Sequence, residues 1–97
     1  MYIHSDSLQV TYDPAKNAHN VRKHGLSFDR AVDFDFHTAI AFQDTRRDYG
    51  EVRIRSLGLL DGRVHHLVFV ETTEGIRVIS LRKANRRESR KWLAGRK

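Results

Sequence analysis

The sequence VHHLVFVETTEGIRVISL, residues 64–81, contains the two most apolar runs of the chain. Residues 64–71 and 76–81 are both rich in β-branched side chains, and Glu74-Gly75 between them is typical of a turn. A strand that is apolar on both faces belongs in the middle of a sheet. We therefore expect two central strands, with other elements covering both of their faces.

Three further strands are predicted upstream of this pair. Residues 39–43 and 52–60 are rich in β-forming side chains, and Asp61-Gly62 after the second run is the strongest hairpin signal in the chain. Together with the central pair, these runs predict four successive antiparallel strands. A short strand at residues 10–12 comes before them.

Three helices complete the pattern. The first starts at Asp13-Pro14, because the carboxylate can cap free N–H groups and proline is well suited to the first helical position, and it ends near His24 before Gly25. A second, short helix follows Ser27 over residues 28–35, and a third spans residues 84–94. The element order indicates an α+β domain with a compact antiparallel sheet, two N-terminal helices and one C-terminal helix. The spacing of apolar residues predicts which side chains of each helix face the core. They are Ala15, Ala18, Val21 and Arg22 in the first helix, Phe28, Ala31, Val32 and Asp35 in the second, and Trp92 and Leu93 in the third.

Length and composition limit the class of protein. The chain has 97 residues, one proline and no cysteine, which fits a single domain over residues 1–97, with residues 1–9 as a polar leader. Without cysteine there are no disulfides, thiolate catalysis or zinc–thiolate sites, so we expect a reducing cytoplasm. No apolar run approaches the roughly 20 residues that span a bilayer, and a domain this small leaves little room for a bulky cofactor.

Positive charge is concentrated at the C-terminal end. Residues 1–81 carry 10 Lys and Arg against 11 Asp and Glu, whereas residues 82–97 carry 8 against 1, within a net charge of +6. Clustered cations attract polyanions, since neutralised phosphates release their counterions. A solvated helix face is the plain alternative. The density of the charge favours a nucleic acid or an acidic protein partner, and charge alone does not distinguish these two.

Two arginine-containing strands could carry chemistry. Strict alternation in Glu51-Val52-Arg53-Ile54-Arg55 directs Val52 and Ile54 to the core and the charged residues to the opposite face. A carboxylate between guanidiniums suits phosphodiester cleavage, which needs a base and fixed cations, although a surface ion-pair ladder gives the same pattern. Arg77 and Arg82 can each bind a phosphate through a guanidinium. They are five positions apart, so they share a face only if a twist or a strand end at Arg82 breaks the regular alternation of the strand.

Histidines provide further candidates. Lys23-His24 lies on the last turn of the first helix, where the imidazole can act as an acid or base or simply cap the helix. We expect no metal site, because no zinc-binding spacing occurs and the adjacent His65 and His66 face opposite sides of a strand. Asp44, Asp48 and Glu51 form an acidic loop without a glycine where a calcium loop requires one, so we interpret it as a solvated loop. The six histidines are His4, His19, His24, His37, His65 and His66.

A set of motifs over residues 10–93 resembles the BrnT family, the toxin components of bacterial type II toxin–antitoxin systems. The motifs are Tyr12-Asp13, Lys16, Asn20, Lys23-His24-Gly25, Ser27-Phe28 and Ala31, then Glu51, Arg53 and Gly58, and finally Arg77-Val78-Ile79-Ser80-Leu81-Arg82-Lys83-Ala84 with Glu88. The resemblance implies a RelE-like ribonuclease fold and cytoplasmic RNA cleavage that inhibits translation. It also implies a BrnA antitoxin with a ribbon-helix-helix domain, in a complex of two toxins and two antitoxins that binds operator DNA.

Our leading hypothesis is a metal-independent endoribonuclease with no cofactor. The 2′-hydroxyl of the RNA would attack its own phosphodiester, with His24 and Glu51 as base and acid in either order. The alternative is a non-catalytic nucleic-acid-binding module that uses the basic C-terminal helix. The expected catalytic residues are Lys23, His24, Glu51, Arg53, Arg77 and Arg82, and the expected RNA-binding residues are Arg55, Lys83, Arg86, Arg87 and Arg90.

Overall fold

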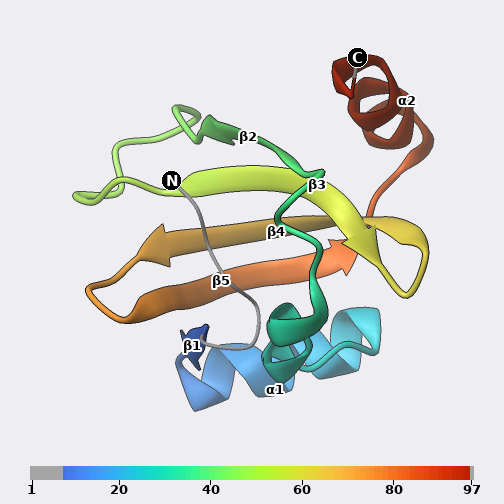
Figure 1. The fold of residues 1–97 in the computed structure, drawn as a ribbon. Coiled ribbons are helices and arrows are strands. Elements are labelled where there is room, and N and C mark those ends of the chain that lie inside the picture. Colours follow the sequence, from blue (N-terminus) through green and yellow to red (C-terminus); the bar gives the residue numbers. More distant parts are fainter. Residues whose placement is uncertain (1–7, 97) are drawn as a thin grey trace.

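The computed structural model describes residues 8–96, which form a five-stranded sheet with helices on both of its faces (Figure 1). The elements are β1 (Gln9–Thr11), α1 (Pro14–His24), the 3₁₀ helix η2 (Phe28–Asp33), β2 (Ile40–Gln43), β3 (Ile54–Leu60), β4 (Arg63–Glu71), β5 (Gly75–Lys83) and α2 (Arg86–Gly95). The mixed α+β class is therefore confirmed. The polar leader ends earlier than expected, because Leu8 packs against the core and β1 begins at Gln9; residues 1–7 of that leader lie outside the described residues.

The sheet has the strand order β1-β5-β4-β3-β2. Strands β2 to β5 form four successive antiparallel strands, and β4 and β5 lie inside the sheet, as predicted. The expectation of a wholly antiparallel sheet is wrong at β1, which pairs with β5 in parallel. The chain reaches β5 from β1 by a long crossover through α1, η2 and three strands, and such a crossover permits parallel pairing.

Local signals in the sequence fix several turns and helix ends. The Asp13 side chain accepts a hydrogen bond from Ala15 N at 2.9 Å, and Gly25 ends α1 with a φ of 70°. Asp61 and Gly62 have φ angles of 53° and 75°, as a tight turn between twisted antiparallel strands requires. The β3–β4 hairpin predicted at this dipeptide is therefore confirmed.

The second helix differs from the prediction. Residues 28–33 form one short 3₁₀ helix capped by the Ser27 side chain, not an α-helix over 28–35. Helices of this type occur in short pieces, and here the chain turns extended at Phe34, whose ring is fully buried. Phe28 and Ala31 are buried as expected, whereas Val32 is exposed.

The inner face of α1 is also different. The predicted stripe of Ala15, Ala18, Val21 and Arg22 is exposed, and the helix instead buries Asn20. Asn20 Nδ2 donates to Leu26 O at 2.9 Å and to Leu81 O at 2.8 Å. A buried amide is stable when its hydrogen bonds are made, so a polar residue fixes α1 to the sheet where an apolar one was expected.

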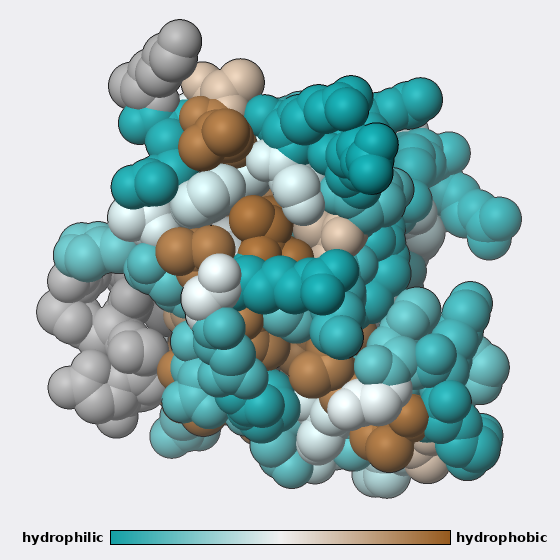
Figure 2. All heavy atoms as spheres, turned by 90° about the vertical axis from the view of Figure 1, so that its right-hand side faces the viewer, coloured by the Kyte–Doolittle hydropathy of each residue, from teal (hydrophilic) through white to brown (hydrophobic). Residues whose placement is uncertain are grey.

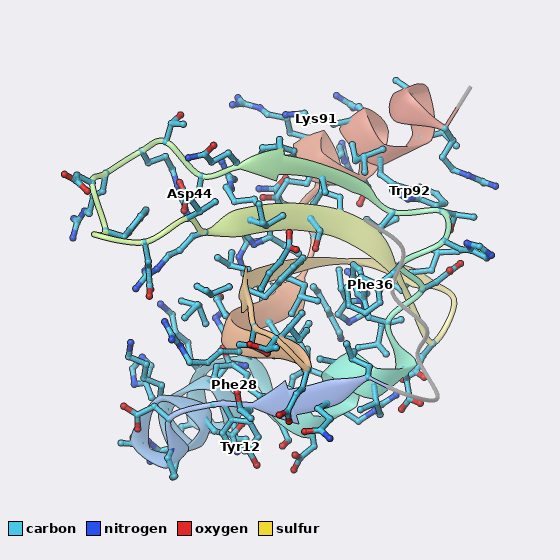
Figure 3. The ribbon with its side chains drawn as sticks, turned by 60° about the vertical axis from the view of Figure 1, so that its left-hand side comes forward. Tyr12, Phe28, Phe36, Asp44, Lys91 and Trp92 are labelled. Carbon is cyan, nitrogen blue, oxygen red and sulfur yellow. The ribbon has the colours of Figure 1, made fainter. Side chains whose placement is uncertain are left out.

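Two apolar clusters cover opposite faces of the sheet. The larger joins η2 and Phe34 to one face of β3, β4 and β5, and includes Leu67, Phe69 and Leu81. The smaller joins α2 to the other face through Leu57, Ala84 and Trp92. Trp92 points from α2 toward the sheet (Figure 3), and its Nε1 donates to Thr38 O at 3.0 Å. The prediction that Leu93 also anchors this helix is wrong, since Leu93 is 64% exposed.

No helix within residues 8–96 is long and apolar enough to cross a membrane.

Candidate active site

A β-bulge in β5 places two predicted site arginines on the same face of the sheet. In the pairing with β4, Val68 faces Ser80 but Phe69 faces Val78, so Ile79 is an extra residue. His66 then faces Arg82 and Val70 faces Arg77. Directly paired residues share a face, and His66 and Val70 lie an even number of positions apart on β4. Arg77 and Arg82 therefore project from one face, as a shared site requires.

This face is polar where α2 does not cover it. We call it the charged face and define it by Glu51, Arg53, Arg55, His66, Arg77, Arg82 and Glu88. Leu57 and Trp92 pack on the same side nearer to α2. The end of the molecule that carries α2 and the β3–β4 hairpin shows mostly hydrophilic side chains, with apolar patches between them (Figure 2).

Glu51 joins two strands of the charged face. Its Oε2 accepts from Arg53 Nε at 3.0 Å, and its Oε1 accepts from Arg77 Nη2 at 2.6 Å. Hydrogen bonds from Arg77 and Arg53 lower the pKa of the Glu51 carboxyl below its usual range. The predicted grouping of Glu51 with Arg53 is thus observed, and Arg77 completes a triad with one net positive charge.

The loop before β3 is built to hold Arg53. The Asp44 side chain is buried and accepts from Arg46 Nε and Nη2, both at 2.8 Å, and from Tyr49 Oη at 3.0 Å. These contacts keep Asp44 inside the loop between β2 and β3 (Figure 3), and the Arg46 hydrogen bonds lower the pKa of its carboxyl. The Arg53 guanidinium lies 4.1 Å from the centre of the Tyr49 ring. The interpretation of these acidic residues as a merely solvated loop is therefore wrong for Asp44.

A second polar group surrounds His66. Arg82 donates to the two oxygens of Glu88 at 2.8 and 2.9 Å, and Glu88 also caps α2 through Asn85 N. Arg82 holds the pKa of Glu88 at about 2. Arg55 Nε donates to His66 Nε2 at 3.2 Å. Burial is the main cause that lowers the pKa of His66 to about 4, with Arg82 as a further cause, so the ring is neutral near pH 7.

His24 lies beside a cavity of about 350 Å³ between α1 and β5. Burial lowers the pKa of His24, and the charges of Lys23 and Arg82 lower it further. An imidazole that is neutral near pH 7 can accept a proton. The lining residues are Ala15, Lys16, His19, Asn20, Lys23, His24, Phe28, Ile79 and Ser80.

His24 and Glu51, the two predicted acid–base residues, have different surroundings. Glu51 is bonded to Arg77 and His24 is influenced by Arg82, and these arginines are five residues apart on β5. At about 3.3 Å per residue, that separation is roughly 15 Å. Glu51 therefore contacts Arg77 on the charged face, whereas His24 lies on α1 beside the cavity that Ile79 and Ser80 line.

The predicted RNA-binding residues fall into three places. Arg55 lies on the charged face, whereas Lys83 follows Arg82 and projects from the opposite side of β5. Arg86, Arg87 and Arg90 are exposed on α2. Lys91 of this helix lies with its Nζ 4.1 Å from the centre of the Phe42 ring.

The histidines do not form a metal site within residues 8–96, where no group of three or more His, Asp or Glu side chains gathers closely enough to hold an ion. His65 and His66 face opposite sides, as predicted, and His65 Nδ1 is 2.8 Å from Arg63 O. His4 lies outside the described residues. Sequence reasoning did not assign His66, Glu88 or Tyr49 to the site. For Glu88, the spacing Asn85-x-x-Glu88 is a capping-box signal that could have placed the carboxylate near the end of β5.

These features define a class of protein. A small α+β domain with a guanidinium-rich sheet face and a neutral histidine beside it is suited to binding and transforming phosphate-rich polymers. The model of the BrnT family, described as the ribonuclease toxin of a type II toxin–antitoxin system, matches residues 12–88. The chain therefore belongs to the BrnT family, which confirms the resemblance seen in its motifs and implies an RNA substrate and an antitoxin partner. No curated protein sequence matches the chain significantly.

Proposed function

We propose that this chain is a metal-independent endoribonuclease that cleaves RNA on the charged face. The observation that carries the proposal is the Ile79 bulge, which brings Arg77 and Arg82 to the face that also holds Arg53 and Glu51. Several fixed guanidiniums can stabilise the charge that develops on a phosphodiester during attack, and each well-placed donor is worth roughly 10² to 10³ in rate.

In the proposed reaction the 2′-hydroxyl oxygen attacks the adjacent phosphorus and the bond from phosphorus to the 5′-oxygen breaks. The products are a 2′,3′-cyclic phosphate and a 5′-hydroxyl. His24 takes the proton of the 2′-hydroxyl, because burial and neighbouring cations keep its ring neutral. The 5′-oxygen takes a proton from solvent, and Lys23 and Arg82 hold the phosphate.

Glu51 has an organising role in this scheme. Both of its carboxylate oxygens accept from arginines, and its lowered pKa makes it a weak base. It fixes Arg53 and Arg77, which would bind phosphates further along the strand. Arg55 would contribute to the same path, and Arg86, Arg87 and Arg90 would extend it across α2.

The proposal includes the finer properties implied by the family. The chain would act in the cytoplasm, inhibit translation by RNA cleavage and share the RelE-like ribonuclease fold. Its partner would be a BrnA-type ribbon-helix-helix antitoxin, with two toxins and two antitoxins in a complex that binds operator DNA. Because the arginines of α2 are exposed, we expect an acidic segment of the antitoxin to bind over them.

The test is cleavage of RNA by the purified protein in excess chelator, followed by chemical mapping of the new ends. We expect cleavage to persist and the new ends to carry 2′,3′-cyclic phosphate and 5′-hydroxyl groups. Loss of activity that Mg²⁺ or Mn²⁺ restores would contradict the metal-independent scheme. Tight RNA binding without any cleavage would favour the non-catalytic nucleic-acid-binding module instead.

A further inference from the structure

Arg55 differs from the other arginines of the charged face. Arg53 and Arg77 are paired with Glu51, and Arg82 is paired with Glu88. Within residues 8–96 the only hydrogen bond of the Arg55 side chain runs from Nε to His66 Nε2, and no carboxylate lies within salt-bridge distance. The two terminal nitrogens of Arg55 therefore keep their donors, and its positive charge is not compensated by a bonded carboxylate.

The Arg55 side chain is nevertheless held in one orientation. Its Nε is anchored on His66 at 3.2 Å, and its guanidinium lies 5.2 Å from the centre of the Phe42 ring. Phe42 faces Arg55 directly across the β2–β3 pairing. A guanidinium that is fixed at Nε and stacked on a ring presents its two terminal nitrogens as a fork, which matches the oxygens of a phosphate.

His66 suits this supporting role because it can stay neutral. It is only 3% exposed and lies between Arg55 and Arg82, so protonation is disfavoured by burial and by both guanidiniums. An imidazole accepts a hydrogen bond without bringing negative charge. A carboxylate at this position would also orient Arg55, but it would neutralise the fork and compete with phosphate for its donors.

The same arrangement leaves a buried donor without a partner. Arg55 Nε–H can only donate, so His66 Nε2 accepts, and in a neutral ring the proton then lies on Nδ1. His66 Nδ1 is buried and has no hydrogen-bond partner among the described residues. A buried polar atom without a partner destabilises a fold, whereas an apolar side chain of similar size would not. His66 is thus a poor choice for stability and a suitable one for holding Arg55.

We propose that Arg55 is the principal phosphate-binding fork of the charged face and that His66 is its positioning residue. The inference rests on the proposed function, in which RNA is the substrate. It adds that Arg55 is the main residue that binds the RNA and that His66 orients Arg55 for this contact. The roles of Arg55 and His66 can be separated by experiment, because His66 contacts Arg55 from the interior and is itself too buried to reach RNA.

The experiment measures the dissociation constant of a short, uncleavable 2′-O-methyl oligoribonucleotide and the melting temperature of each variant. We expect Arg55→Ala and His66→Leu each to weaken binding about 10-fold, as for a lost hydrogen bond to a charged group. His66→Leu should melt at the wild-type temperature or above it, since it removes the unpaired Nδ1–H. His66→Gln should retain binding, because its amide oxygen can accept from Arg55 Nε.

Matched controls and a double variant make the test specific. His65→Leu changes the neighbouring buried histidine on the opposite face, and Arg63→Ala removes an exposed arginine from the hairpin; neither should alter binding. Arg55→Ala combined with His66→Leu should bind like Arg55→Ala alone, since His66 acts through Arg55. Arg55→Ala should also reduce the salt dependence of binding by about one phosphate contact.

Two results would overturn the inference. One is wild-type affinity in both Arg55→Ala and His66→Leu while the wild-type protein itself binds the oligoribonucleotide. The other is an additive effect of His66→Leu in the Arg55→Ala background, which would mean that His66 does not act through Arg55. If His66→Leu does not fold, His66→Phe takes its place in the same cycle. Failure of the wild-type protein to bind or cleave RNA would instead reject the proposed function, and this inference with it.

Discussion

Arg77 and Arg82 project from the same face of the sheet although five residues separate them on β5. The cause is Ile79, an extra residue between Val78 and Ser80 that has no pairing partner on β4. A regular strand would direct these two arginines to opposite faces. Bulges often redirect a side chain next to a functional site, and this one also places Ile79 in the wall of the cavity beside His24.

The first prediction concerns the arginines of the charged face. Arg82→Ala removes a group that holds the reacting phosphate, so cleavage should slow by about 10². Arg53→Ala removes a phosphate contact further along the strand, so it should slow cleavage at RNA concentrations below KM. The fold should remain, because the side chains lie outside both apolar clusters. Single-turnover cleavage and circular dichroism measure the two properties. Arg63→Ala serves as the control for the lost charge, and wild-type rates in both folded variants would place the site elsewhere.

The second prediction distinguishes His24 from Glu51 as the base. The pKa of His24 lies below its ordinary value of 6.5, and a base must be deprotonated to act. The cleavage rate should therefore rise with pH through a value below 6.5 and then level off. His24→Gln should remove this acid limb and slow cleavage by roughly 10² to 10⁴. Glu51→Gln should slow cleavage but keep the limb; the reverse pattern would assign the base to Glu51.

Local chemistry explains which parts of the fold were predictable. Asp13-Pro14, Gly25 and Asp61-Gly62 act within a few residues, and each forms the cap or turn that its side chain and backbone favour. The inner face of α1 was not predictable in this way. Asn20 is polar in the sequence, and its burial depends on the Leu81 carbonyl, which is 61 positions further along the chain.

The same distinction holds for the candidate site. Alternation in residues 51–55 correctly predicted that Glu51 and Arg53 lie together, since both belong to one short segment. It wrongly directed Val52 to the core: Val52 comes before β3 begins at Ile54, and it is 57% exposed. The bulge at Ile79 depends on how β5 pairs with β4, and the partnership of His66 with Arg55 depends on the β3–β4 register. Sequence alone gave no signal for either, because an apolar run and a histidine pair are equally compatible with regular strands.

The third prediction concerns pH and stability at His66. Its pKa is about 4 in the folded protein against 6.5 for an ordinary histidine, so the unfolded chain binds the proton more tightly. Stability should be complete above pH 6.5 and should fall as the pH drops from 6.5 to about 4, by up to about 3 kcal/mol. Glu88, with a pKa of about 2, adds a loss only below its ordinary value of 4.5.

Urea denaturation at several pH values measures this effect. His66→Leu has no titrating group at this position, so its stability should decline less than that of the wild type between pH 6.5 and 4. Curves that run parallel over this interval would show that His66 does not titrate differently in the folded and unfolded states. His65→Leu provides the comparison for a buried histidine on the other face of the sheet.

The last prediction concerns the antitoxin and the basic helix. Arg86, Arg87 and Arg90 are exposed on α2, and Lys91 also points away from the core, toward the Phe42 ring. An antitoxin that blocks RNA most directly would cover this helix and the Arg53 region with acidic side chains. Changing all four α2 residues to glutamine should then weaken toxin–antitoxin association by more than the roughly 0.2 to 1 kcal/mol of one exposed ion pair. Arg47→Gln with Arg63→Gln, which removes exposed charges elsewhere, should have little effect. Titration calorimetry at low salt decides the outcome: an unchanged dissociation constant for the quadruple variant would mean that the antitoxin binds another surface and that the basic helix serves RNA alone.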